Sequence, residues 1–162
     1  MFDTLIFILE KQLKLYKSLY ELAGEKTEMI KSNDIDGLNR LMTDEQKHIT
    51  AITALEEERI REMEKLFPDR NPLPSLTDCI QTAGPHESDR LEYLYEQLTD
   101  ILHRTKERNN LNQELIRQSL QFVNFNLQLL RRTPEQITYR PPAEQKRKTA
   151  PGNPSSLFNS KV

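Results

Sequence analysis

Two histidines stand at spacings that a metal site could use. Glu45-Gln46-Lys47-His48 places a carboxylate three residues before an imidazole, and His103 follows Asp100 by the same step. Carboxylate-bridged di-iron bundles need two Glu-x-x-His pairs plus two further Glu residues, all facing inward. This sequence holds one such pair. A metal-binding bundle is therefore a minor alternative, which would require bound iron or manganese in the purified protein, and we expect no metal and no cofactor.

The cysteine and glycine content excludes other chemistries. The single cysteine, Cys79, cannot form an internal disulfide and has no histidine near it in the sequence, so we interpret it as a small buried apolar group. A phosphate-binding loop needs clustered glycines, but the four glycines are scattered: Gly24, Gly37, Gly84 and Gly152. No strand–turn–helix context supports a Ser/His/Asp set. These observations predict a protein that is not an enzyme.

The charge balance argues against a nucleic-acid or membrane partner. The chain has 162 residues, and its 23 Lys and Arg against 25 Asp and Glu give a net charge of −2. Such a balance produces no overall field for an anionic partner. The longest wholly apolar run, Leu5–Leu9, is far short of a membrane span or a signal-peptide core. We expect a cytoplasmic protein in a reducing compartment, without membrane insertion and without bound nucleic acid.

Heptad spacing of apolar residues predicts long helices. Over residues 2–32 the rows are Phe2, Leu9, Tyr16, Ala23 and Ile30, with Leu5, Leu13 and Leu19 between them. Over residues 34–67 they are Ile35, Met42, Ile49, Glu56 and Met63, and Leu38, Glu45, Ile52, Arg59 and Leu66. Ser32-Asn33-Asp34 is a break whose short polar side chains cap the second helix. Two helices of similar length joined by a short link indicate an antiparallel hairpin.

Three further segments complete the organisation. Pro68, Pro72 and Pro74 end the second helix, and Ser75–Asp78 fits a capping box that opens a short helix over residues 75–82. A long helix follows Gly84-Pro85 and spans about residues 87–132. Residues 133–162 hold five of the nine prolines and a net charge near +3, which predicts a disordered, basic tail. The expected fold is all-α, a coiled-coil-like bundle of 1–132.

The long helix changes character at Leu111. Before it, the apolar residues span about 120° of a helical wheel, as for packing on one neighbour. After it they span about 180°, and the residues are Leu111, Leu115, Ile116, Leu120, Phe122, Val123, Leu127, Leu129 and Leu130. Either several helices surround this segment, in a core or a homo-oligomer, or part of the face awaits a partner helix.

A polar row lies within the same arc. It comprises Asn109, Asn112, Ser119 and Asn126, with a seven-residue step between the last three. One interpretation is that one or two buried asparagines determine the helix register, as an a-position Asn does in coiled coils. The other is that these side chains hydrogen-bond a partner. Both interpretations stay open at this point.

Two stretches resemble the FlgN-type flagellar export chaperones. The first lies in Leu13–Arg61 and contains Met29-Ile30-Lys31-Ser32-Asn33-Asp34-Ile35-Asp36-Gly37-Leu38, Leu41, Asp44-Glu45-Gln46, Ile49 and Leu55-Glu56-Glu57-Glu58-Arg59. The second contains Asn109, Asn112, Leu115-Ile116, Ser119-Leu120, Asn126 and Leu129-Leu130. The order of the helices follows the same layout. Together the likeness covers about 130 residues plus the tail.

The resemblance implies a function and a site. Members of this family are cytoplasmic helical chaperones that bind hook-associated (hook–filament junction) proteins, prevent their premature assembly and deliver them to the flagellar type III export gate. Carried over to this sequence, the client-binding residues are expected to be Asn112, Leu115, Ile116, Ser119, Leu120, Val123, Asn126, Leu127 and Leu130. The chaperone is expected to be a monomer or a weak homodimer. The alternative is a homo-oligomeric coiled-coil scaffold without a secretion client.

Overall fold

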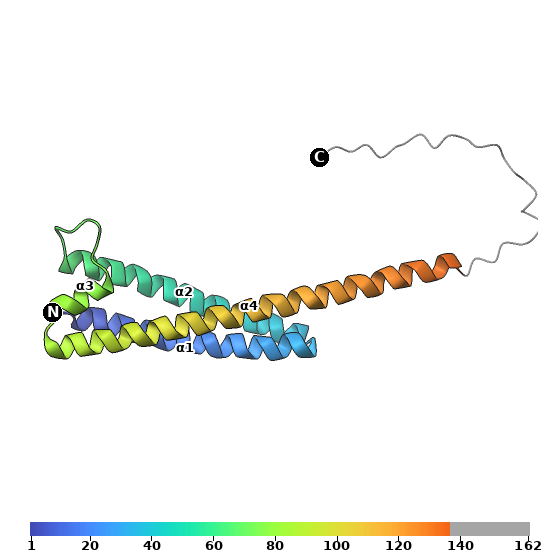
Figure 1. Cartoon of the computed structure of the whole chain (residues 1–162), viewed down its shortest axis with the longest axis horizontal. Helices are drawn as coiled ribbons and strands as arrows, with labels where there is room; N and C mark the ends of the chain where they lie inside the picture. Colours follow the sequence, from blue (N-terminus) through green and yellow to red (C-terminus); the bar gives the residue numbers. More distant parts are fainter. Residues whose placement is uncertain (137–162) are drawn as a thin grey trace, which may run out of the picture. The chain divides into compact units, whose positions relative to one another are not determined.

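The computed structural model describes residues 1–136 of the chain, with side chains through Arg131. Within this range the protein is all-α, as predicted, with α1 at Asp3–Ser32, α2 at Ile35–Leu66, α3 at Leu76–Thr82 and α4 at Pro85–Gln136 (Figure 1). The chain divides into two units, Met1–Gln121 and Phe122–Val162. Most of the predicted tail, residues 137–162, lies outside the described residues.

Capping interactions separate α1 from α2. Asn33 ends α1 with a left-handed backbone (φ 55°), and its N–H donates to the carbonyl of Ile30. Asp34 then caps α2, because its Oδ1 accepts a hydrogen bond of 2.9 Å from the backbone N–H of Gly37. The predicted break and the predicted cap are therefore confirmed, and the two-residue link produces the hairpin.

The ends of α3 and α4 follow local sequence rules as well. Ser75 and Asp78 form the predicted capping box at the start of α3. Helix α4 begins at Pro85, two residues before its predicted start, because proline suits the first helical position, where its missing N–H is not needed. The N–H of Ser88 donates to the carbonyl of Gly84 over 2.8 Å and closes the first turn. The helix extends to Gln136, beyond the predicted end at Arg132 and past Pro134.

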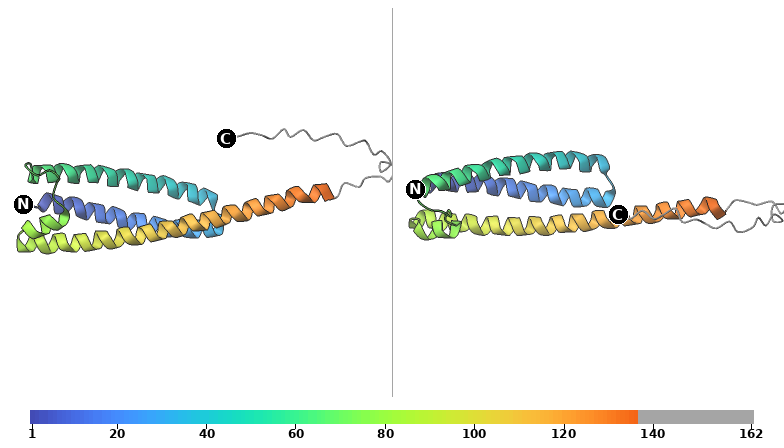
Figure 2. Two further views of the ribbon diagram at one scale, coloured as in Figure 1. Left: turned by 45° about the horizontal axis from the view of Figure 1, so that its top comes forward. Right: turned by 90° about the horizontal axis from the view of Figure 1, so that it is seen from above.

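In the first unit, α1 runs beside both α2 and α4 (Figure 2). Gln12 donates to Glu56 and Lys26 pairs with Glu45, so residue numbers fall along α2 as they rise along α1. For the contacts between α1 and α4, the residue numbers increase together along both helices. These contacts join Glu10 to Arg90, Tyr20 to Arg104, and Thr27 to Asn112. Helix α4 is therefore parallel to α1, and α2 is antiparallel to it.

The hydrophobic core lies at the end of this unit that carries α3. It contains Phe2, Leu5, Leu9, Leu13, Met63, Cys79, Leu91, Leu94, Leu98 and Ile101. Helix α3 closes this end, because Cys79 is fully buried and its Sγ lies 3.8 Å from the sulfur of Met63. The short helix thus packs against the three long ones where they are otherwise open.

Candidate functional site

The half of α4 in the first unit faces α1 along one stripe. Leu91, Leu94, Leu98 and Ile101 are buried, and Thr105 and Asn112 continue the same three- and four-residue steps. This is the a/d spacing of a helix that packs on a single neighbour. The stripe changes from apolar to polar as it approaches the segment for which the sequence predicts client binding.

Asn112 occupies the centre of this polar stretch and is 2% exposed. Its Nδ2 donates to the carbonyl of Ala23 over 2.9 Å, and its Oδ1 accepts from the Thr27 hydroxyl over 2.5 Å. Both bonds join α4 to α1, so the side-chain amide is satisfied inside the bundle. Of the two interpretations of the polar row, this geometry supports the register-determining one for Asn112, since a shift of α4 would leave a buried amide unpaired.

The other members of the polar row are less deeply placed. Asn109 and Ser119 are half-buried in the first unit, and the hydroxyl of Ser119 donates to the carbonyl of Leu115 within α4 over 3.0 Å. Leu115 is also half-buried. In the second unit, Asn126 is half-buried. The row thus consists of one buried residue, Asn112, and three half-buried ones.

The apolar residues of the wide arc are mostly exposed. In the first unit Ile116 is 39% exposed and Leu120 is 59% exposed, and Leu111 is exposed as well. In the second unit the exposed apolar residues are Phe122, Val123, Phe125, Leu127, Leu129 and Leu130. Contiguous exposed apolar surface on a soluble protein marks a site for another molecule. Among the described residues, the apolar side chains of the wide arc are therefore mostly not part of the core.

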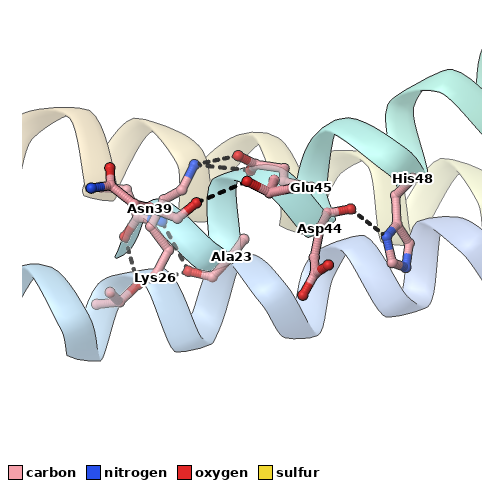
Figure 3. Close-up of polar contacts among 9 residues, drawn as sticks. Ala23, Lys26, Asn39, Asp44, Glu45 and His48 are labelled. Carbon is pink, nitrogen blue, oxygen red and sulfur yellow. Dashed lines mark hydrogen bonds and ion pairs between the residues drawn. The ribbon is translucent and has the colours of Figure 1, made fainter. Parts of the chain in front are cut away.

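Charged contacts between α1 and α2 account for the polar residues in the hairpin seam. The ammonium of Lys26 lies 2.7 Å from Oε2 of Glu45, and both side chains are 16% exposed (Figure 3). Nδ1 of His48 lies 2.8 Å from the carbonyl of Asp44, to which it can only donate. Nε2 of the same ring lies 2.8 Å from the Ser18 hydroxyl, within hydrogen-bond distance. His48 is thus used as a bridge between the two helices.

A pocket of about 270 Å³ lies between α1, α2, α3 and α4. Its lining is mainly apolar and includes Leu5, Leu9, Met63, Leu76, Leu98 and Leu102. Arg59 chelates Glu56 with two hydrogen bonds of 2.7 and 2.8 Å, and this guanidinium lowers the pKa of the Glu56 carboxyl. Burial raises the pKa of Tyr16, which also lines the pocket. The pocket offers packing surface with one internally neutralised ion pair.

The described residues present no arrangement suited to catalysis. In this part of the chain no group of three or more His, Cys, Asp or Glu side chains could hold a metal ion. Burial raises the pKa of the Cys79 thiol and disfavours its reactive thiolate. His103 pairs with Glu107 on the surface at 3.3 Å. None of the helices in residues 1–136 has the length and hydropathy needed to cross a bilayer.

Sequence reasoning missed one set of exposed residues. Ile35, Met42 and Ile49 of α2 were placed in the hairpin seam by their seven-residue spacing, yet their exposed fractions are 63%, 52% and 44%. The same row contains the charged residue Glu56. This residue already indicates that the row is not buried along its whole length. Phe125, in the second unit, is another exposed apolar residue outside the predicted set.

These features define a class: an all-helical protein whose long helix α4 displays an exposed apolar face. Comparison with known proteins agrees with this class. Residues 1–147 match the FlgN protein family, to which the chain belongs. It is 32% identical to the uncharacterized protein YvyG of Bacillus subtilis (strain 168) over 148 residues, which are 91% of each chain. No solved structure matches. Membership of the FlgN family implies the role of a flagellar export chaperone, which is not enzymatic.

Proposed function

We propose that this protein is a cytoplasmic chaperone for hook-associated proteins, the proteins of the hook–filament junction. It binds these clients before secretion, prevents their premature assembly and delivers them to the flagellar type III export apparatus. Family membership supports the export role. The observation that supports client binding most directly is the exposed apolar face of α4, from Ile116 to Leu130.

The proposed site comprises Asn112, Leu115, Ile116, Ser119, Leu120, Val123, Asn126, Leu127 and Leu130. Among them Ile116, Leu120, Val123, Leu127 and Leu130 repeat at steps of four and three residues, and each is exposed. That spacing matches the anchors by which one amphipathic helix holds another. Asn112 acts indirectly in this proposal, because its bonds to Ala23 and Thr27 hold α4 in register against α1.

The energetics suit a complex that forms in the cell and is released at export. Burying one large apolar side chain contributes about 1.5–3 kcal/mol. Five anchors therefore outweigh the cost of ordering a client segment and leave micromolar or tighter affinity. The same ordering cost keeps the complex reversible.

The double variant Ile116→Asp/Leu120→Asp tests the proposed site. Two lost anchors, each replaced by a charge, should weaken binding of a hook-associated protein from the same cell by about 100-fold or more. Binding is measured by isothermal titration calorimetry on the full chain. Helicity by circular dichroism should survive, because neither side chain belongs to the core.

A charge-matched control uses the opposite side of the same helix. Gln118→Asp/Gln121→Asp introduces two carboxylates at exposed positions of α4 and should leave the affinity unchanged. Unchanged binding by Ile116→Asp/Leu120→Asp would contradict the site. Failure of the wild-type chain to bind any hook-associated protein, together with a stable oligomer, would instead support the scaffold alternative.

A further inference from the structure

Three long helices in the first unit occupy three positions of a four-helix bundle. The seam of α1 formed by Leu5, Leu9, Gln12 and Tyr16 points between α2 and α4 and lines the pocket described above. At one end α3 takes the fourth position, where Leu76 borders the pocket and Cys79 is fully buried. Helix α3 has only seven residues, so it covers about two turns of that seam.

The row of α2 beside this seam is covered at one end only. Met63 is 1% exposed next to α3, and Glu56, one heptad earlier, lines the pocket. Two further steps of seven reach Ile49 and Met42, which are 44% and 52% exposed. The row thus carries core-type residues beyond the reach of α3, but no helix of residues 1–121 covers them.

The facing row of α4 behaves in the same way. Tyr95 and Leu102 line the pocket, and the next two steps of seven reach Asn109 and Ile116. Ile116 is exposed, and the half-buried Asn109 side-chain amide makes no hydrogen bond to the described residues of this unit. The row therefore offers two apolar contacts, one free amide and one tyrosine ring.

The contacts of α1 place the two rows at the same level. Lys26 pairs with Glu45 of α2, and its neighbour Thr27 bonds Asn112 of α4. The segment of α2 from Met42 to Ile49 and the segment of α4 from Asn109 to Ile116 therefore flank the same turns of α1. Within residues 1–121, no hydrogen bond or ion pair joins α2 to α4. Polar contacts therefore do not bridge the space between the two rows.

We infer that one amphipathic helix of the client occupies this fourth position, packing on Met42 and Ile49 of α2 and on Leu102 and Ile116 of α4. This inference rests on the proposed function and extends its site to α2. A helix fits this position, because the rows of α2 and α4 both repeat at seven-residue steps. Such rows form the holes into which the side chains of an additional helix pack. The occupant presents an apolar stripe with one polar side chain to hydrogen-bond Asn109.

The client is the favoured occupant because the α4 row continues into the proposed client surface. Ile116 belongs to both sets, and the next steps of seven in the sequence are Val123 and Leu130, which are proposed client contacts.

The test compares two faces of α2 in the full chain. Met42→Asp/Ile49→Asp places two carboxylates on the exposed apolar row and should weaken binding of the hook-associated protein at least tenfold. Thr43→Asp/Thr50→Asp places the same charges one position further along, about 100° around the helix, and should change the affinity less than twofold. All four side chains are exposed, so both variants should keep wild-type helicity.

The outcomes separate this inference from the proposed function. If Ile116→Asp/Leu120→Asp abolishes binding but Met42→Asp/Ile49→Asp does not weaken it, the inference is wrong and the chaperone function stands. If the wild-type chain binds no hook-associated protein, both fail. A second measurement identifies the occupant directly, by placing the photo-crosslinking residue benzoylphenylalanine at position 49 in place of Ile49. Crosslinks to a client peptide support the inference, whereas crosslinks only to a second copy or to residues 137–162 overturn it.

Discussion

At the scale of the residue, this protein uses buried polar groups to choose one helix pairing among several. Apolar heptad rows alone tolerate a slide of one helix past another by seven residues, because each step restores a similar pattern. Asn112 and Thr27 remove that freedom between α1 and α4 by a hydrogen bond of 2.5 Å. Lys26 and Glu45 do the same between α1 and α2.

Asn112→Ala should lower the free energy of unfolding by about 2 kcal/mol. The substitution removes both bonds to α1 and leaves a small cavity at a position that is 2% exposed. Urea denaturation followed by circular dichroism measures the loss. Asn110→Ala, at an exposed position two residues away, is the matched control and should change stability by less than about 0.5 kcal/mol.

A double-mutant cycle with Thr27→Val isolates the bond between the two side chains. If the bond matters, the double variant should lose less stability than the sum of the single variants. Strict additivity, or an unchanged midpoint for Asn112→Ala, would show that Asn112 does not contribute to the register of α4.

At the scale of the element, the α1–α2 hairpin depends on how α2 begins. Asp34 accepts the N–H of Gly37, and Gly37 is buried beneath that carboxylate. A Cβ on Gly37 would collide with the Asp34 side chain. The glycine is therefore needed here for space, since its backbone is ordinary helix.

Gly37→Ala should destabilise the protein, although alanine is the better helix former by about 1 kcal/mol. The added methyl group displaces the Asp34 cap, which is itself worth about 1 kcal/mol. Thermal unfolding of Gly37→Ala, Asp34→Ala and the double variant provides the measurement. In the Asp34→Ala background the penalty of Gly37→Ala should largely disappear, because the colliding carboxylate is gone. An equal penalty in both backgrounds would point to a clash with another neighbour.

At the scale of the whole molecule, an apolar helix face is combined with little net charge. The formal charge of −2 gives weak mutual repulsion between copies, and large side chains such as Leu120 and Leu130 are exposed. Exposed apolar surface of this kind associates either weakly and reversibly with a second copy of the chain or with a client. The balance between these two depends on concentration.

Size-exclusion chromatography with light scattering should find mainly monomer at micromolar concentration, with a mass that rises as the protein is concentrated. Addition of a stoichiometric hook-associated protein should replace this mixture by one complex of defined mass, because client and second copy compete for the same apolar face. A tight oligomer whose mass is independent of concentration and unaffected by the client would favour the scaffold alternative.

Much of the fold was predictable because it depends on local rules. Seven-residue apolar steps, the polar break at Asn33 and Asp34 and the capping box at Ser75 depend on residues a few positions apart, and the structure confirms them. Helix α4 begins at Pro85, two residues before the expected start near Glu87, since proline suits the first position of a helix. Its end was placed four residues early, because Pro134 was treated as a boundary although the helix continues past it to Gln136.

The site was predictable only in part, because exposure depends on distant neighbours. The polar row of α4 is visible in the sequence, but its pattern does not say that Asn112 meets Ala23 and Thr27, residues 85 or more positions away. The exposed row at Met42 and Ile49 has the same spacing as a buried seam. A heptad pattern predicts that a row of residues can pack against another helix. It does not indicate whether that helix belongs to the same chain.

The amino-acid sequence by itself determined the helices, their caps and the hairpin, because these follow from short-range spacing. The tertiary structure alone decided which rows are covered. It assigned Asn112 to the interior, joined Lys26 to Glu45, and showed that within residues 1–121 the seven-residue α3 covers one end of the α1 seam only. Burial is a property of three-dimensional neighbours, and a one-dimensional periodicity does not specify them.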